Sequence, residues 1–337
     1  MAVEVDIRVP VGRPLPELMD FIRSCEDAGF HGVGIHDHHH SGRDVYAALT
    51  LAAATTERLT LYPATTNTVT RHPLVLAAIA NSLVEIAPGR IMLTLAPGFL
   101  SVEKAGKPQA RREQLGEVVT ALRLLLSGHP AVVEGQELRM NNVAAPAPKI
   151  FILAAGPKML ELAGEVADGV VMLVGLHPDG IEAARQHVRT GAARAGRSAG
   201  EVEEIFIVPT AVEDFETARE WPRRWFRPGQ PFLNYPSVAN LRWLHAAGID
   251  IPADHRPEDL SPELAARVCD AFGLFGPPEY CADRLLRAHE ESGVNRVFFF
   301  PSHTAESGYD LPAADVTAFG KIIGPRLAAA GRVATGA

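Results

Sequence analysis

The chain alternates short runs of β-branched and apolar residues with longer stretches that have helical spacing, and it does so eight times. The expected strands cover residues 3–9, 33–38, 59–65, 91–96, 150–155, 169–174, 204–209 and 297–300. These runs are mostly apolar without strict alternation, which is typical of parallel strands covered on both faces. The pattern predicts an α/β fold, a (β/α)8 barrel. A doubly wound sheet is the competing fold, but no GxGxxG sequence follows the first strand.

Two segments are longer than strand–helix connections need to be. We expect one barrel domain over residues 1–330, interrupted by a loop at 127–149 that could form a short hairpin. A second insertion, 215–276, lies before the last helix–strand unit and contains all three tryptophans and many prolines. Long insertions in barrels usually form lids or pocket walls, although a dimer contact would look similar. Residues 331–337 are predicted to be a flexible tail.

Composition narrows the class of protein. There are 32 basic and 40 acidic side chains, a net charge of −8, and no extended basic cluster, which argues against nucleic-acid binding. No apolar run approaches the length of about 18 residues that a membrane span needs, and the N-terminus does not resemble a signal peptide. The three cysteines form no CxxC pair. We therefore expect a cytoplasmic protein in a reducing compartment, with no membrane partner.

The residues that follow the expected strands are short polar side chains and glycines, with few carboxylates. Catalytic groups of a barrel collect at the carboxyl ends of its strands. Those positions here are residues 37–40, 65–67, 97–99, 155–158, 175 and 302–303. This composition suits a flat ligand that forms hydrogen bonds better than a hard cation.

The histidines after the second strand allow two interpretations. His36 and His38 share one face of the strand, as in metal-dependent barrel hydrolases. A metal site would also need a third histidine and a carboxylate at later strand ends, where only His303 is available, so we predict no metal. His38 follows Asp37 directly, and an Asp–His pair at a barrel mouth can hold an imidazole for acid–base chemistry.

Residues 155–158, Ala-Gly-Pro-Lys, begin a helix with proline in its first turn. Unbonded N–H groups and the helix dipole at such a position can bind a phosphate. A plain strand-to-helix turn is an equally good interpretation of this segment from the residues alone. The sequences GxSxG, HExxH and GxxxxGK[ST] are absent, which removes the main support for three other enzyme classes.

Three stretches resemble a known family. Residues 32–98, 154–173 and 275–300 are similar to the luciferase-like flavin-dependent superfamily, and more narrowly to its methylenetetrahydromethanopterin reductase-like branch. The resemblance covers roughly residues 1–215 and 273–330 and leaves the tryptophan-rich insertion unmatched. Ala64, Thr68 and the sequence IAPGR (86–90) depart from the family's usual Gly, Pro and SGGR.

The resemblance implies a (β/α)8 barrel that binds FMN or the deazaflavin coenzyme F420 at the strand ends. It places Asp37 and His38 at the cofactor ring, with His38 as proton donor or orienting group. It also implies a non-prolyl cis peptide at Ala64–Thr65. The remaining cofactor positions that it implies are Thr66, Asn67, Gly98, Ala155, Gly156, Lys158 and Gly175. For the substrate pocket we expect His39, His40, Trp225, Phe232 and His303.

Two reactions follow from this resemblance. The first is F420-dependent hydride transfer to or from a small organic substrate. The second is an FMN monooxygenase that takes reduced flavin from a partner reductase and uses O2 in a dry, apolar pocket. A non-catalytic flavin-binding barrel is disfavoured by the full set of site residues. Family members are often dimers or tetramers, so we expect a homodimer or a higher homo-oligomer.

Overall fold

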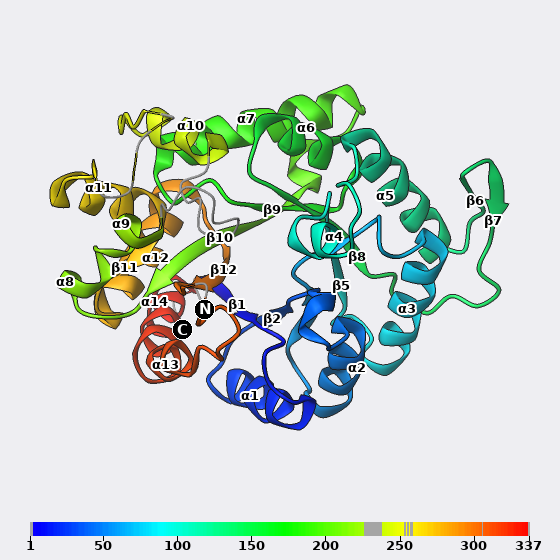
Figure 1. The fold of residues 1–337 in the computed structure, drawn as a ribbon, viewed down its shortest axis with the longest axis horizontal. Helices are drawn as coiled ribbons and strands as arrows, with labels where there is room; N and C mark the ends of the chain where they lie inside the picture. The colour runs from blue at the N-terminus through cyan, green and yellow to red at the C-terminus, as the bar shows by residue number, and fades with distance from the viewer. Residues whose placement is uncertain are drawn as a thin grey trace.

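The computed structural model describes residues 3–225, 238–252, 254, 256, 259–304 and 306–335. Its centre is a ring of parallel strands (Figure 1), in the order β3-β2-β1-β12-β10-β9-β8-β5-β4. A bridge between Leu61 and Ile91 joins β3 to β5, so the ring is nearly closed. The strands are β1 (Glu4–Val9), β2 (Gly32–Ile35), β3 (Thr60–Pro63), β4 (Thr66–Asn67), β5 (Met92–Ala96), β8 (Lys149–Ala154), β9 (Gly169–Met172), β10 (Glu203–Ala211) and β12 (Arg296–Pro301). The predicted barrel is confirmed.

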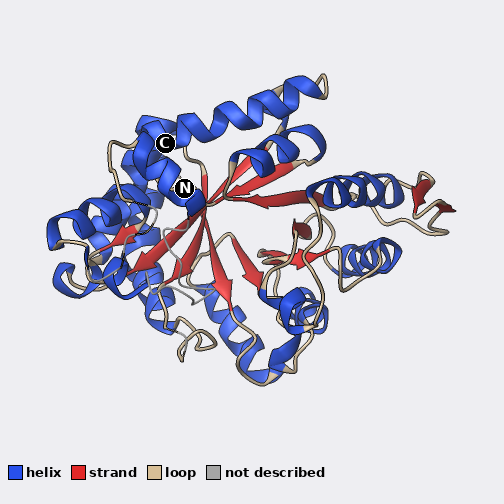
Figure 2. Cartoon of the chain, turned by 45° about the horizontal axis from the view of Figure 1, so that its top comes forward, coloured by secondary structure: helices blue, strands red, loops and turns tan. Residues whose placement is uncertain are grey.

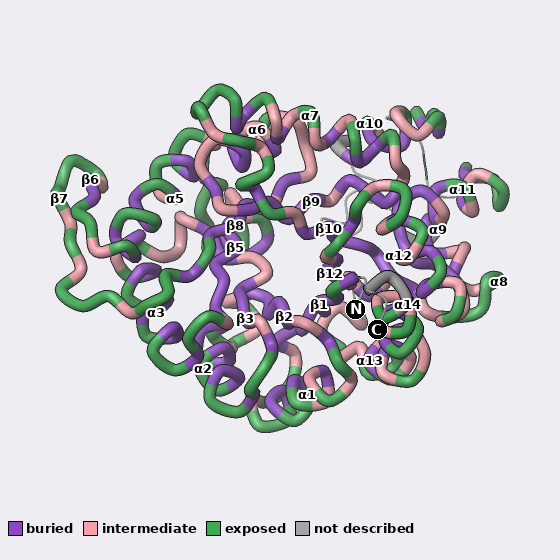
Figure 3. Tube along the Cα trace, turned by 180° about the vertical axis from the view of Figure 1, so that it is seen from behind, coloured by how far each residue is buried: buried purple, intermediate pink, exposed green. Residues whose placement is uncertain are grey.

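Helices surround this ring on the outside (Figure 2), as parallel strands joined by helical crossovers require. They are α1 (Leu15–Asp27), α2 (Val45–Thr55), α3 (Pro73–Ile86), α5 (Arg112–Leu126), α6 (Pro157–Val166), α7 (Pro178–Arg194), α12 (Pro278–Ser292), α13 (Ala313–Ala318) and α14 (Gly324–Thr335). The helices turn apolar side chains toward the strands or toward neighbouring helices; in α1 this stripe includes Leu18, Ile22 and Cys25. Figure 3 shows the result, with buried strands inside and exposed helix surfaces outside.

The first strand alternates strictly, contrary to our general description of the strands. Val5, Ile7 and Val9 belong to the core shared with the helices, whereas Asp6 and Arg8 are the buried charged residues of the opposite face. Asp6 accepts hydrogen bonds from Tyr62 Oη at 2.7 Å and from Arg296 Nη2 at 2.8 Å. Tyr62 belongs to a second apolar cluster that fills the barrel, together with Met92, Phe151, Val171, Ile205, Ile207 and Phe298. The polar face of β1 therefore lines the barrel interior.

The loop expected at 127–149 contains a short antiparallel hairpin, β6 (Ala131–Val133) and β7 (Gln136–Leu138). The hairpin projects from the barrel beside α3 and α5 (Figure 1). Its turn uses Glu134 and Gly135 at φ of 51° and 79°. The return segment is held to α3, where Asn81 Oδ1 accepts a hydrogen bond of 2.7 Å from the Ala144 amide.

The described part of the insertion 215–276 is largely helical. It contains α8 (Phe215–Ala218), α9 (Trp221–Trp225), α10 (Val238–Ala246) and α11 (Pro262–Phe272), followed by the short strand β11 (Leu274–Phe275). The strand β11 pairs with β10 at the edge of the barrel, which we did not expect from the sequence. That the insertion forms a pocket wall, or alternatively a dimer interface, stays a prediction.

Other elements also differ from the sequence-based expectation. A short helix, α4 (Leu100–Lys104), follows β5, and the sequence did not indicate it. The last helix, α14, continues to Thr335, so residues 331–335 are helical where a flexible tail was predicted. Of the described helices, none is both long and apolar enough to cross a membrane.

Candidate functional site

The histidines after β2 lie against a buried arginine. The rings of His36 and His38 are 4.6 Å apart, so the two side chains do share one side of the chain. Arg8 at the end of β1 donates from Nε to His36 Nε2 at 2.8 Å and from Nη2 to the carbonyl of Gly308. Its guanidinium also lies over the ring of Phe300, 5.0 Å from the centroid. The guanidinium of Arg8 therefore bonds the His36 nitrogen that a metal ion would use if His36 and His38 were metal ligands.

The environment keeps these histidines neutral. Burial lowers the pKa of His36 well below its usual value, that of His38 to about 3 and that of His303 to about 4. The charge of Arg8 lowers each of these pKa values further. Burial also lowers the pKa of Arg8, to about 9. In the part of the chain that the structure describes, no cluster of three or more His, Cys, Asp or Glu could hold a metal.

Asp37 does not orient His38, contrary to our prediction. Successive side chains of an extended segment point to opposite sides, so the Asp37 carboxylate is turned away from its neighbour. It accepts hydrogen bonds from Thr66 Oγ1 at 2.9 Å and from Arg71 Nη1, and its side chain is fully buried. Arg71 also bonds Asp44, the residue that caps α2. Asp37 thus links the end of β2 to β4, through Thr66, and to the segment before α3, through Arg71.

Tyr309 takes the place that we had assigned to Asp37. This residue lies in the loop after β12, and its hydroxyl is 3.0 Å from His38 Nδ1 and 2.8 Å from His40 Nε2. His39 points elsewhere, with Nε2 3.1 Å from Thr70 Oγ1 and Nδ1 3.4 Å from the Asp37 carboxylate. His303 is buried and bonds the Pro301 carbonyl at 2.9 Å through Nδ1.

The segment between β3 and β4 has the backbone that the resemblance implies. The peptide bond Ala64–Thr65 is cis. The next two side chains, Thr66 and Asn67, are buried and already bonded within the protein. Asn67 Oδ1 accepts from the amides of Val69 and Thr70 at 3.0 and 2.8 Å, which fixes the turn before α3. Their predicted contact with a cofactor ring stays a prediction.

Apolar side chains at the carboxyl ends of the strands are only half-buried. Ala64, Leu153, Leu173 and Phe300 pack on the cluster that fills the barrel, yet each stays partly exposed. They come from four different strand ends. Because the arginine and histidines described above stand beside them, the barrel mouth combines an apolar floor with polar groups on one side. This combination is typical of sites for flat organic ligands.

The turn before α6 lies across the ring from the histidines. Gly156 is the N-cap residue of this helix, so no capping side chain bonds the N–H groups of the first turn. Lys158 is exposed in the same turn. Two residues of α10 fix the adjacent backbone: Trp243 Nε1 donates to the Ala155 carbonyl at 2.8 Å, and Asn240 Nδ2 donates to the Leu173 carbonyl at 3.0 Å. The insertion is therefore attached to the predicted phosphate turn.

The remaining predicted residues have different surroundings. Gly98 and Gly175 have φ of 87° and 83°, and a Cβ would come within 2.2 Å of Val102 Cγ2 at Gly98 and 2.8 Å of the Ala271 carbonyl at Gly175. Helix packing thus requires both glycines, whatever the cofactor. Phe232 lies outside the described residues, and so does the side chain of Trp225.

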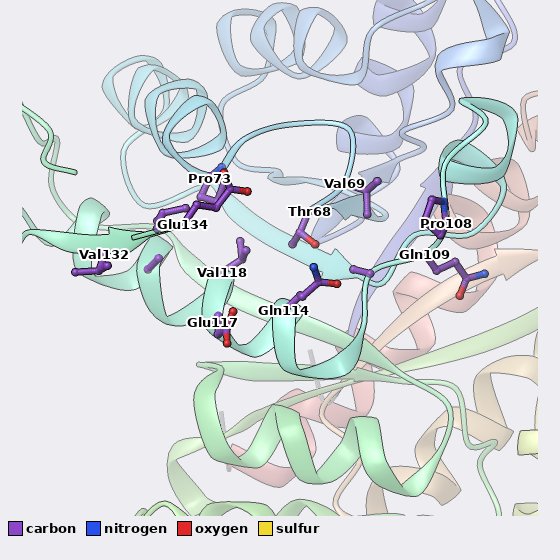
Figure 4. A pocket seen from close by; sticks show the side chains of 13 residues that line it. Thr68, Val69, Pro73, Pro108, Gln109, Gln114, Glu117, Val118, Val132 and Glu134 are labelled. Carbon is purple, nitrogen blue, oxygen red and sulfur yellow. The ribbon is translucent and has the colours of Figure 1, made fainter. Parts of the chain in front are cut away.

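A cavity of about 340 Å³ lies on the flank of the barrel rather than at its mouth (Figure 4). It is lined by the segment after β4 (Thr68, Val69), by α5 (Gln114, Val118) and by the hairpin. None of the predicted catalytic or phosphate-binding residues lines it. We therefore locate the candidate site by the strand ends and not by this cavity.

Comparison with known proteins agrees with this geometry. The model of the family described as luciferase-like monooxygenase matches residues 3–296. The chain belongs to this family. It is 34% identical over 297 residues to a 5,10-methylenetetrahydromethanopterin reductase of Methanolobus tindarius, which covers 81% of this chain and 86% of that protein. It is 30% identical over 311 residues to an F420-dependent glucose-6-phosphate dehydrogenase of Microbacterium testaceum, covering 86% and 89%.

A solved structure supports the same fold. The coenzyme F420-dependent tetrahydromethanopterin reductase from Methanopyrus kandleri superposes with a TM-score of 0.67 at 20% identity, covering 96% of this chain and 99% of that one. Its family and its relatives show that the chain is an oxidoreductase, as the resemblance implied.

Sequence reasoning missed three residues of the site. Arg8 could have been found, because residues 4–9 alternate between charged and apolar side chains and so mark Asp6 and Arg8 as facing the barrel interior. Arg71 and Tyr309 gave no such signal. Their contacts join segments that lie 34 and 271 residues apart in the chain, and one sequence contains no information on such pairs.

The buried Asp37–Arg71 pair yields a stability prediction. In the Arg71→Met variant the Asp37 carboxylate stays buried without its cation, which should lower the free energy of unfolding by about 3–5 kcal/mol. Adding Asp37→Asn should recover much of that loss, because the uncompensated charge disappears. Urea unfolding of the single and double variants measures both effects. Arg112→Met, at a partly exposed arginine paired with Glu113 at the surface, is the control, and an equal loss there would contradict the role of the pair.

Proposed function

We propose that this protein is an F420-dependent oxidoreductase that transfers a hydride to or from a small organic substrate at the barrel mouth. The single observation that carries the proposal is the set of neutral histidines held around Arg8, facing the half-buried apolar floor. The names of its relatives support F420: the relative from Microbacterium is an F420-dependent dehydrogenase. The methylenetetrahydromethanopterin and the glucose 6-phosphate in the names of these relatives belong to those proteins, and for this chain we propose only a small organic substrate.

The residues at the strand ends fit a deazaflavin. The apolar floor of Ala64, Leu153, Leu173 and Phe300 can lie against a flat ring system. Buried polar atoms without a hydrogen-bond partner, including His36 Nδ1 and Ser302 Oγ, stand at the same end of the strands. At the far side, the first turn of α6 offers backbone N–H groups and Lys158 to a phosphate. When bound, F420 supplies a two-electron hydride carrier.

The chain's own contribution is to position a proton. His38 is buried enough to remain neutral, and its Nδ1 is bonded to Tyr309, so Nε2 is the nitrogen that would exchange a proton with a substrate hydroxyl or carbonyl. The positive charge of Arg8 beside the floor would favour the reduced, anionic form of a deazaflavin ring. Trp243 and Asn240 hold the carbonyls next to the phosphate turn, which keeps that turn in one conformation.

An FMN-dependent monooxygenase is the second candidate, and the description of the matching family favours it. Such an enzyme would need reduced flavin from a separate reductase, which would then be a protein partner of this chain. The same strand-end residues would hold the phosphate and the ring. The two candidates differ in which cofactor binds.

Cofactor binding can be followed through Trp243, which is 2% exposed and bonded to the Ala155 carbonyl. We expect F420 to quench tryptophan fluorescence with a higher affinity than FMN. Gly156→Asp should weaken that binding at least tenfold, because a carboxylate would stand against the phosphate, whereas Gly200→Asp on the exposed turn after α7 should not change it. A preference for FMN would favour the monooxygenase, and binding of neither would refute the cofactor assignment.

The role of His38 predicts a separation of binding from turnover. His38→Ala should keep cofactor affinity within about twofold while kcat falls by roughly 10²-fold or more, because the proton donor is lost. Fluorescence titration and F420 absorbance under steady-state conditions measure the two quantities. Normal turnover by this variant would show that another group moves the proton.

We also propose that the chain forms a homodimer or a higher homo-oligomer. Supporting it, the outer surfaces of α2 and α3 expose Leu51, Val75 and Ile86, at 41%, 48% and 43%. Analytical ultracentrifugation should give a mass of at least twice 36.2 kDa, and Val75→Glu should lower it. A monomer at micromolar concentration would contradict this part of the proposal.

A further inference from the structure

One hydroxyl connects a half-buried histidine of the candidate site to an exposed one. Tyr309 Oη lies 3.0 Å from His38 Nδ1 and 2.8 Å from His40 Nε2, and the two imidazole rings are nearly parallel at 5.5 Å. His40 is exposed to solvent, whereas Tyr309 and His38 are partly covered. The three groups thus form a path of hydrogen bonds from the barrel mouth to water.

A tyrosine hydroxyl has only one proton to donate, which couples its two partners. When His40 is neutral with its lone pair on Nε2, Tyr309 donates a hydrogen bond to His40 and accepts one from His38 Nδ1–H. When His40 is protonated, its Nε2–H donates to Tyr309, and the tyrosine proton turns to His38 Nδ1. His38 must then carry its own proton on Nε2. The protonation state of the exposed ring therefore sets the tautomer of the covered ring.

We propose that Tyr309 is a proton-relay residue, which couples protonation of His40 at the surface to the tautomer of His38 that carries its proton on Nε2 at the barrel mouth. The inference rests on the proposed function, in which His38 Nε2 exchanges a proton with the substrate. It adds a route by which His38 Nδ1 exchanges a proton with the surface through Tyr309 and His40.

Each step of the relay balances. In the direction of substrate deprotonation, a substrate hydroxyl gives its proton to His38 Nε2. His38 Nδ1–H passes to Tyr309 Oη, the tyrosine proton passes to His40 Nε2, and His40 releases a proton to water. One proton enters, one leaves and no electrons move. His38 ends neutral, with its proton on Nε2. It returns to the Nδ1–H form when the Nε2 proton leaves to water at the open mouth and a proton reaches Nδ1 from His40 through Tyr309.

The charges around the path explain why a relay is needed. Burial, together with His40, Arg8, His39 and His303, lowers the pKa of His38, so a free imidazolium there is costly at neutral pH. Burial raises the pKa of Tyr309, which therefore keeps its hydroxyl proton. His40 faces Lys104 of α4 and His39, and burial and both of these charges lower its pKa. We expect His40 to titrate below the ordinary histidine range, while His38 does not become charged.

The relay can be tested without cofactor or substrate. Nitrogen-15 NMR of histidine-labelled protein distinguishes Nδ1–H from Nε2–H in each neutral ring, and His38→Gln and His40→Gln assign the two signals. As the pH falls from 8 through the titration of His40, we expect His38 to change from mostly Nδ1–H to mostly Nε2–H, with the same midpoint as that titration.

Tyr309→Phe keeps the ring and removes the hydroxyl. In this variant His40 should still titrate, but the tautomer of His38 should no longer follow it. His129→Gln, at an exposed histidine before the hairpin, should leave the coupling intact. If Tyr309→Phe does not fold, His40→Gln serves instead and should make the His38 tautomer independent of pH.

A His38 tautomer that stays constant while His40 titrates in the unsubstituted protein would overturn the relay, and so would coupling that survives Tyr309→Phe. Failure of the relay is distinct from failure of the proposed function, because the latter is tested by fluorescence titration with F420 and FMN. With cofactor bound, Tyr309→Phe should lower kcat roughly tenfold or more and leave cofactor affinity unchanged.

Discussion

Arg8 introduces a positive charge into the interior of the barrel, and the arrangement of the candidate site depends on it. A buried guanidinium needs acceptors for its fixed set of donors. Here they are His36 Nε2 and the Gly308 carbonyl, with the ring of Phe300 below the cation. These contacts bring the end of β2 and the loop after β12 to the end of β1. The same loop carries Tyr309, so the path from His38 to His40 exists because Arg8 holds the loop in place.

Two kinds of electrostatic arrangement share the small volume at the strand ends. On one side a cation is surrounded by neutral imidazoles, whose burial keeps them from charging. On the other side of the same strand end, the buried Asp37 is paired with Arg71. Burial alone would lower the pKa of Arg71, but Asp37 and Asp44 outweigh it and raise that pKa. Side chains alternate along this extended segment, and that alternation separates the two arrangements. His36 and His38 lie with the cation Arg8, whereas Asp37 between them lies with Arg71.

The architecture could be predicted because it is repeated in the sequence: each short apolar run became a strand and each amphipathic run a helix. The shared side of His36 and His38 followed from the period of an extended chain, and the position of the cis peptide followed from the family motif. The hydrogen-bond partner of His38 could not be predicted from the sequence. Asp37 is its neighbour in sequence, but geometry turns the two apart, whereas Tyr309 comes from a loop whose path depends on tertiary packing. The glycines at 98 and 175 were identified at the right positions, but packing against α4 and α11 explains them without a cofactor.

The attachment of α10 has a consequence for how such enzymes diversify. Asn240 and Trp243 donate hydrogen bonds to main-chain carbonyls of the barrel, those of Leu173 and Ala155. Main-chain carbonyls are present at these strand ends whatever residues the barrel carries. A different insertion could therefore be grafted onto the same barrel if it kept two donors at equivalent places on one helix. Substrate preference could then change by exchange of a module, while the strand-end residues that we propose for the cofactor and the proton remain as they are.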